Sequence, residues 1–183
     1  MTKALVSTDI APTGTTPADP NNRGESAGSN LGQIVQGEVA TFRYTATVPA
    51  HTTIAGGELS DDGLFRWTGS PTPPNNRQVA YELIPGSPAA TFDGSSALPA
   101  GFTLDADGTL HFPASYQNAT SSAQVFAVTI EVWVRDADAS TPGYTPNFPN
   151  GKTLTNTARF AYTNPNTGSP ATALSATANV SYI

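Results

Sequence analysis

Apolar and polar residues alternate along several short segments of the chain, which is the pattern of strands that bury one face. The alternation is clearest in residues 38–48 and 125–134, where five apolar residues in each segment fall on one side. The full set of predicted strands is 3–10, 38–48, 57–67, 78–84, 102–112, 125–134, 153–162 and 174–182. No segment carries apolar residues at sustained helical spacing. The pattern therefore predicts an all-β sandwich of about eight or more strands.

Two polar stretches interrupt this pattern. Residues 11–33 and 137–151 are rich in Pro, Gly, Asn and Thr and are too hydrophilic to pack into a core. We expect both to be long insertion loops on the surface.

Composition narrows the class of protein. The 183 residues include no cysteine, so disulfides and thiolate metal sites are excluded. The net charge is -6 and the basic residues are scattered, which argues against nucleic acid as a partner. No apolar run is long enough for membrane insertion, and the N-terminus lacks the features of a signal peptide. Abundant Thr, Ser, Ala, Gly and Pro with two lysines is typical of bacterial cell-surface modules. We therefore expect a piece of an exported protein whose signal and anchor lie outside this chain.

One polar residue stands where the strand pattern calls for an apolar one. In the segment 154–162, alternation places Asn156 on the same face as Ala158 and Phe160. Burying an amide without partners costs a few kcal/mol. Asn156 therefore needs either a full set of hydrogen bonds within the core or a chemical role, and the strand pattern leaves both open.

The order of five segments resembles a known family. They are Thr-Lys-Ala-Leu-Val at 2–6, Gln-Gly-Glu-Val-Ala-Thr-Phe-Arg-Tyr at 36–44, Val-Pro-Ala-His-Thr-Thr at 48–53, Glu-Leu-Ser-Asp-Asp-Gly-Leu at 58–64 and Gly-Lys-Thr-Leu-Thr-Asn-Thr-Ala at 151–158. This sequence of motifs is similar to the isopeptide-forming immunoglobulin-like domains of bacterial pilins and adhesins, of the collagen-adhesin CnaA type. The resemblance runs the whole length and implies an Ig-like sandwich.

The resemblance implies a covalent bond between Lys3 and Asn156, promoted by the acid Asp61. The motif around Asp61 is two residues shorter than is usual in the family, so Glu58 is the competing acid. Alternation puts Asp61 on the side of Leu59 and turns Glu58 the other way. Each residue also has an ordinary interpretation, because a lysine near a terminus is commonly solvated and Asp61 could belong to a tight turn. The same family pattern makes Glu38 a structural hydrogen-bonding residue.

A second resemblance covers the middle of the chain. Residues 79–83 and 98–110 look like the cadherin-like immunoglobulin repeats of bacterial surface proteins. Both resemblances agree on a sandwich, but they differ on whether the chain holds one or two. We expect residues 1–183 to form a single domain, because the first strand and a late strand must meet for the bond to form.

Other chemistry has little support in the sequence. Asp105 with Asp107, and Asp136 with Asp138, resemble fragments of calcium loops, but neither pair has the spacing of a full oxygen cage, and turns explain both. His51 and His111 are far apart without companion ligands, so no zinc site is expected. No nucleophile or phosphate-binding motif is present. We expect no cofactor and no enzyme activity beyond a single-turnover crosslink.

These observations predict a structural module of a bacterial adhesin, pilus or stalk, located at the cell surface with neighbouring domains of a longer protein as its partners. The alternative is an adhesin module that binds a glycan or a host protein, with or without calcium, through the two insertion loops, where Tyr144 and Phe148 are the aromatic candidates. A third interpretation is a filament subunit that exchanges a terminal strand.

Overall fold

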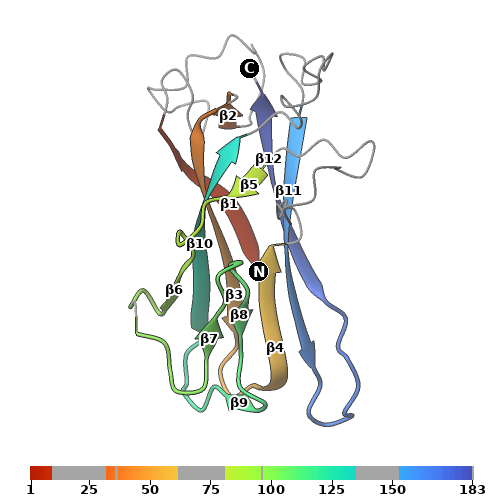
Figure 1. Ribbon diagram of the computed structural model, residues 1–183. Helices are drawn as coiled ribbons and strands as arrows, with labels where there is room; N and C mark the ends of the chain where they lie inside the picture. Colours follow the sequence, from red (N-terminus) through yellow and green to blue (C-terminus); the bar gives the residue numbers. More distant parts are fainter. Residues whose placement is uncertain (10–31, 36, 62–80, 96, 135–152, 183) are drawn as a thin grey trace, which may run out of the picture.

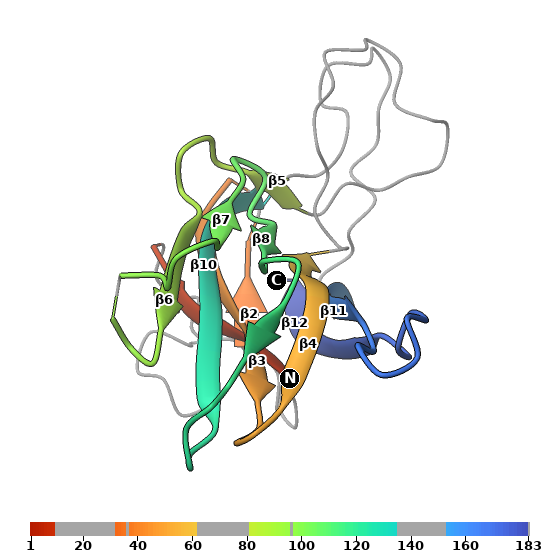
Figure 2. The ribbon, with the colours of Figure 1, turned by 90° about the horizontal axis from the view of Figure 1, so that it is seen from below.

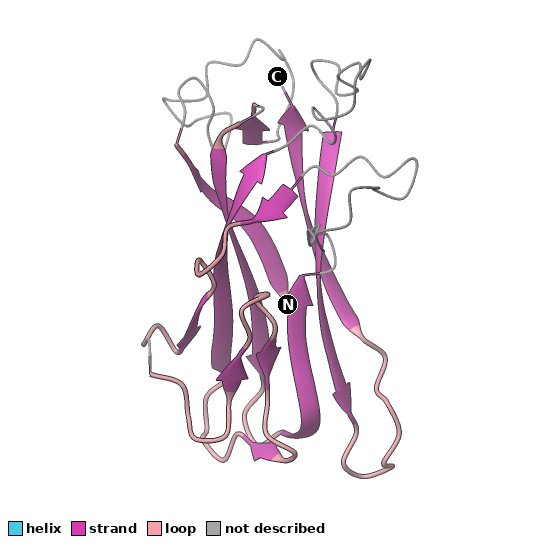
Figure 3. Ribbon diagram, in the orientation of Figure 1, coloured by secondary structure: helices cyan, strands magenta, loops and turns pink. Residues whose placement is uncertain are grey.

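The computed structural model describes residues 1–9, 32–35, 37–61, 81–95, 97–134 and 153–182. These residues contain twelve strands in two packed sheets and no helix (Figure 1, Figure 3). The predicted all-β sandwich is confirmed. Within this described part there is no helix long and apolar enough to cross a membrane.

The first sheet has the strand order β1-β3-β10-β5, and β6 also pairs with β10. Its strands are β1 (Thr2–Thr8), β3 (Val39–Val48), β10 (Gln124–Val134), β5 (Tyr81–Leu83) and β6 (Ala89–Phe92). All of its pairings are antiparallel. β1 therefore lies at one edge of the first sheet, hydrogen-bonded to β3.

The second sheet has the strand order β2-β12-β11-β4-β8-β7, and β9 also pairs with β4. Its strands are β2 (Gly32–Ile34), β12 (Leu174–Tyr182), β11 (Thr153–Thr163), β4 (Thr53–Asp61), β8 (Leu110–His111), β7 (Thr103–Leu104) and β9 (Tyr116–Gln117). Its pairings are antiparallel except that of β2 with β12, which is parallel. Figure 2 shows β3 and β10 in one layer and β4 and β11 in the other.

The core lies between the sheets and is built by the strands with the strongest alternation. On β3 and β10, every second side chain is buried, as the pattern predicted, and these are Ala40, Phe42, Tyr44, Ala46, Val48, Phe126, Val128, Ile130, Val132 and Val134. Toward β7, β8 and β9 the interior is aromatic. Phe126 stacks on Phe102 at 4.8 Å between ring centroids and contacts Phe112 at 4.7 Å. This aromatic packing holds the two sheets together near β7, β8 and β9.

Several predicted boundaries are wrong. The strand expected at 102–112 is broken into β7 and β8 by a turn in which Gly108 takes a φ of +84° and its N–H donates to the carbonyl of Asp105 at 3.0 Å. The loop expected at 11–33 ends too late, because Gly32 and Gln33 are buried in β2. The short strands β2, β6 and β9 were not predicted. Residues 62–67 and 78–80 of two other predicted strands lie outside the described residues.

Candidate functional site

Lys3 lies inside the sandwich. It sits on β1 opposite Tyr44 of β3, and its side chain is fully buried. Its Nζ lies 5.5 Å from the centroid of the Phe42 ring and 5.4 Å from that of Tyr44. Aromatic faces attract a cation, but they do not replace the hydrogen bonds of water. A solvated terminal lysine is therefore excluded, and the amine needs a polar partner within the core.

That partner is Asp61, the last residue of β4 in the opposite sheet. Its side chain is also fully buried, and its Oδ2 accepts a hydrogen bond from Nζ of Lys3. The backbone of Asp61 pairs with that of Ala158 on β11, so the residue belongs to a regular strand and not to a tight turn. A buried ion pair thus joins the two sheets across the interior of the sandwich.

Glu58, the competing acid, lies on the outer face of β4. Its side chain is 58% exposed and its Oε1 lies 3.4 Å from Nδ1 of His111. The alternation of β4 buries Leu59 and Asp61 and exposes Glu58, as the sequence pattern indicated. The geometry therefore brings Asp61, and not Glu58, to Lys3.

Asn156 lies on the inner face of β11 and is fully buried. It is two residues from Ala158, the residue opposite Asp61, so Asn156 and Asp61 are diagonal neighbours on one face of the second sheet. Such neighbours are about 7–8 Å apart. On its other side Asn156 pairs with Ala178 of β12, the strand that β1 approaches from the first sheet. The side chains of Lys3, Asp61 and Asn156 therefore enter one region of the interior.

The amide of Asn156 has no hydrogen-bond partner among the described residues, at either Oδ1 or Nδ2. Leaving a buried polar group unpaired costs about 1–3 kcal/mol. The structure thus does not show the hydrogen-bonded core amide that was the ordinary interpretation of this residue. Within the described part of the chain it shows an unpaired carboxamide on the same inner face as Asp61, the acid that accepts the hydrogen bond of Lys3.

Two further polar residues border this region. Tyr81 of β5 is 1% exposed, and its ring meets that of Phe42 edge-on at 5.1 Å. Burial raises the pKa of Tyr81, and the nearby carboxyls of Asp61 and Glu38 raise it further. Glu38 is fully buried and its Oε1 accepts a hydrogen bond from the Val35 N–H at 2.8 Å. No sequence signal pointed to Tyr81, because an inward tyrosine on a strand is usually an ordinary core residue.

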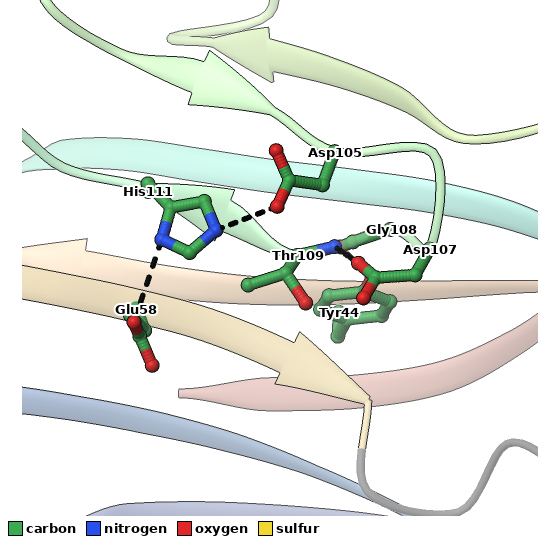
Figure 4. A network of polar contacts seen from close by, with 7 residues as sticks. All are labelled: Tyr44, Glu58, Asp105, Asp107, Gly108, Thr109 and His111. Atoms are coloured by element: carbon green, nitrogen blue, oxygen red, sulfur yellow. Dashed lines mark hydrogen bonds and ion pairs between the residues drawn. The ribbon is translucent and has the colours of Figure 1, made fainter.

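The alternative calcium site is not assembled by the described residues. Asp107 belongs to the β7–β8 turn, where its Oδ1 accepts a hydrogen bond from the Thr109 N–H at 2.8 Å (Figure 4). Asp105 Oδ2 lies 3.0 Å from Nε2 of His111. His111 therefore does have companion carboxylates, contrary to expectation, but Glu58 and Asp105 face its two different ring nitrogens (Figure 4).

A metal ion needs ligands that converge on one point, and in the described part of the chain no group of three or more such side chains does so. Asp136 and Asp138 lie outside the described residues. Tyr144 and Phe148, the rest of the second insertion loop and most of the first insertion loop also lie outside the described residues. The described residues therefore do not test the alternative that the chain binds a glycan or a host protein through its two insertion loops.

In comparisons with known proteins, the fold is similar to that of a bacterial pilin structure. No protein-family model and no curated protein matches the chain. A variant of BcpA, the major pilin subunit of Bacillus cereus, matches with a TM-score of 0.50 and 15% identity over 85% of this chain and 38% of that chain. BcpA itself gives a TM-score of 0.45 and 15% identity, over 82% and 36% of the two chains. The full-length RrgB pilus protein of Streptococcus pneumoniae gives 0.42 and 13%, over 98% and 33%.

At these identities the likeness concerns the fold. The chain spans between 33% and 38% of the length of these three pilin structures.

Proposed function

We propose that this chain is a structural module of a bacterial pilus or similar surface protein, and that it locks itself with an amide bond between Lys3 and Asn156. The observation that carries the proposal is the fully buried Lys3–Asp61 pair beside the unpaired amide of Asn156. The pilin-like fold supports the structural part of the proposal. Because the matched BcpA variant is more than twice as long, with 38% of it covered, we place the module among neighbouring domains of a longer surface protein.

Burial makes the amine reactive. In water a lysine is protonated and cannot attack a carbonyl carbon. Removal from water disfavours both charges of an ion pair, because it lowers the pKa of an amine and raises that of a carboxyl. Transfer of one proton from Nζ of Lys3 to Asp61 gives a neutral amine and a neutral acid without any change in net charge. The short path for that proton is the hydrogen bond between the two side chains.

The bond-forming step then balances within the three residues. Nζ of Lys3 attacks Cγ of Asn156, and the protonated Asp61 donates a hydrogen bond to the amide oxygen as it becomes negative. The proton that the amine loses passes through Asp61 to Nδ2 of Asn156. The Cγ–Nδ2 bond breaks and ammonia leaves. Asp61 ends this step still holding the first proton that it took from Lys3, and the products are one amide bond and one ammonia molecule.

The fold supplies the remaining rate enhancement. Groups held at near-attack distance reach effective molarities of about 10⁵–10⁸ M. Here one reactant stands on β1 of the first sheet and the other on β11 of the second, so the reactants meet only when the sandwich has closed. Folding is therefore the step that starts the reaction.

Intact mass spectrometry of the folded protein tests the proposal. We expect a mass lower than that of the sequence by one ammonia molecule, and a branched peptide containing residues 3 and 156 after proteolysis. Lys3→Met, Asn156→Leu and Asp61→Ala should each keep the full mass. Glu58→Ala is the matched control, because it removes an acid three residues from Asp61 that faces outward, and it should crosslink normally. A wild-type protein that is folded and retains the full mass would refute the proposal.

A further inference from the structure

Four buried side-chain atoms have no hydrogen-bond partner among the described residues. They are Oη of Tyr81, Oε1 of Gln33, and Oδ1 and Nδ2 of Asn156. Folded proteins pair the great majority of such atoms, so each exception calls for an explanation. The proposed function explains the two atoms of Asn156, which are the reacting carboxamide. It does not explain the hydroxyl of Tyr81.

Tyr81 and Lys3 contact the same Phe42 ring, although the strand of Tyr81 is at the opposite edge of the first sheet from β1. The Tyr81 ring contacts Phe42 at 5.1 Å, and Phe42 in turn lies under Nζ of Lys3 at 5.5 Å. Burial raises the pKa of the Tyr81 hydroxyl, and the carboxyls of Asp61 and Glu38 raise it further. Tyr81 therefore keeps its proton and can act only as a neutral phenol, which is a hydrogen-bond donor as well as an acceptor.

A phenylalanine would fill this position at lower cost than a tyrosine whose hydroxyl is unpaired. Among the described residues, the donor at Oη of Tyr81 and the acceptor at Oδ1 of Asn156 are both unpaired. The acceptor is the atom on which negative charge develops during attack. Donors already in place and pointed at developing charge are the strongest electrostatic contribution to such reactions, and catalytic hydrogen bonds often tighten only as the reaction proceeds.

We propose that Tyr81 is a second catalytic donor for the crosslink, which hydrogen-bonds the Asn156 oxygen in the tetrahedral intermediate alongside the protonated Asp61. This inference rests on the proposed function. The balance of the reaction is unchanged: Nζ of Lys3 bonds to Cγ of Asn156, ammonia leaves, and the Tyr81 proton stays on Tyr81 throughout. Asp61 moves the proton, whereas Tyr81 only stabilises charge.

The rate of crosslinking tests this role. The full chain is synthesised in a cell-free system and sampled over time by intact mass spectrometry. Tyr81→Phe removes only the hydroxyl, and we expect it to slow ammonia loss by about 10²-fold, the usual effect of removing one such donor. Tyr44→Phe is the matched control, because the Tyr44 ring is equally close to Lys3 but its hydroxyl already donates to the Gly108 carbonyl. That control should melt at a lower temperature and crosslink at the wild-type rate.

The outcomes separate the inference from the proposed function. If the wild type loses ammonia and Tyr81→Phe does so at the same rate, the role of Tyr81 is refuted and the crosslink stands. If the wild type never loses ammonia, both fail. If Tyr81→Phe does not fold, site-specific replacement of Tyr81 by a fluorotyrosine decides the question. Fluorotyrosine has nearly the same size as tyrosine, but its hydroxyl is more acidic and therefore a stronger hydrogen-bond donor. The rate of ammonia loss should rise, and an unchanged rate would overturn the inference.

Discussion

At the scale of single residues, the ion pair between Lys3 and Asp61 makes each partner depend on the other. Two charges removed from water are tolerated best together, because removing one takes the opposite charge of this pair away from the other, which stays buried. Both side chains are fully buried, so solvent cannot take the place of the missing partner. The intact pair therefore adds little to the free energy of unfolding, whereas removal of one partner lowers that free energy strongly.

This dependence can be measured without interference from the crosslink. In the Asn156→Leu background, which has no electrophile, Asp61→Ala should lower the free energy of unfolding by about 3–5 kcal/mol in urea titrations. Adding Lys3→Met to that variant should recover most of the loss, because the unpaired charge is removed. A double mutant no more stable than Asp61→Ala would contradict the buried pair.

The residue scale also shows how far the sequence predicts the site. Alternation correctly placed Asn156 and Asp61 on buried faces and Glu58 on an exposed one, because β4 and β11 are long enough to show a period. The burial of Lys3 had no such signal, since Ser7 and Asp9 share its side of the strand. The position of Tyr81 depends on the packing of two sheets, and no local pattern records that packing.

At the scale of secondary-structure elements, length decided what could be predicted. β3 and β10 carry five alternating apolar residues each and were found with nearly correct bounds. β2, β6 and β9 have three, four and two residues, which is too short to show a period of two. The continuous strand expected at 102–112 failed because Asp-Ala-Asp-Gly at 105–108 is a turn signal, and the turn prevailed over the apolar residues on either side.

The β7–β8 turn is connected to the site by Tyr44. The Tyr44 hydroxyl donates a hydrogen bond to the carbonyl of Gly108 in the turn, and the Tyr44 ring lies next to Nζ of Lys3. A Cβ at Gly108 would lie 2.9 Å from that hydroxyl and 3.1 Å from Cγ2 of Ile130, at a φ of +84°. Gly86 has a similar φ of +79° with nothing within 4 Å of its Cβ position. Both replacements by alanine strain the backbone, but only Gly108→Ala overpacks the core.

We therefore expect Gly86→Ala to lower the free energy of unfolding by about 1–2 kcal/mol and Gly108→Ala by about 2–5 kcal/mol. Chemical denaturation of the two variants in the uncrosslinked Asn156→Leu background gives both values. Equal losses would mean that backbone strain alone sets the cost and that the turn does not pack against Tyr44.

At the scale of the whole molecule, the proposed bond joins the edge strand of one sheet to the interior of the other. β1 is hydrogen-bonded to β3 in the first sheet, and β11 lies between β12 and β4 in the second. Without a covalent link, tension on the N-terminus would peel β1 from its neighbour. By the chain-entropy argument used for disulfides, closing a loop of about 150 residues also stabilises the fold by roughly 5 kcal/mol.

Single-molecule pulling from the two termini separates the locked from the unlocked molecule. With the bond in place, the load passes from residue 3 to residue 156, and only residues 157–183 can extend, by about 100 Å at roughly 3.6 Å per residue. In Asn156→Leu all 183 residues can extend, which gives about 650 Å before the folded length is subtracted. The length that the bond withholds is set by the positions of residues 3 and 156. A wild-type extension equal to that of Asn156→Leu would show that no covalent path connects the two sheets.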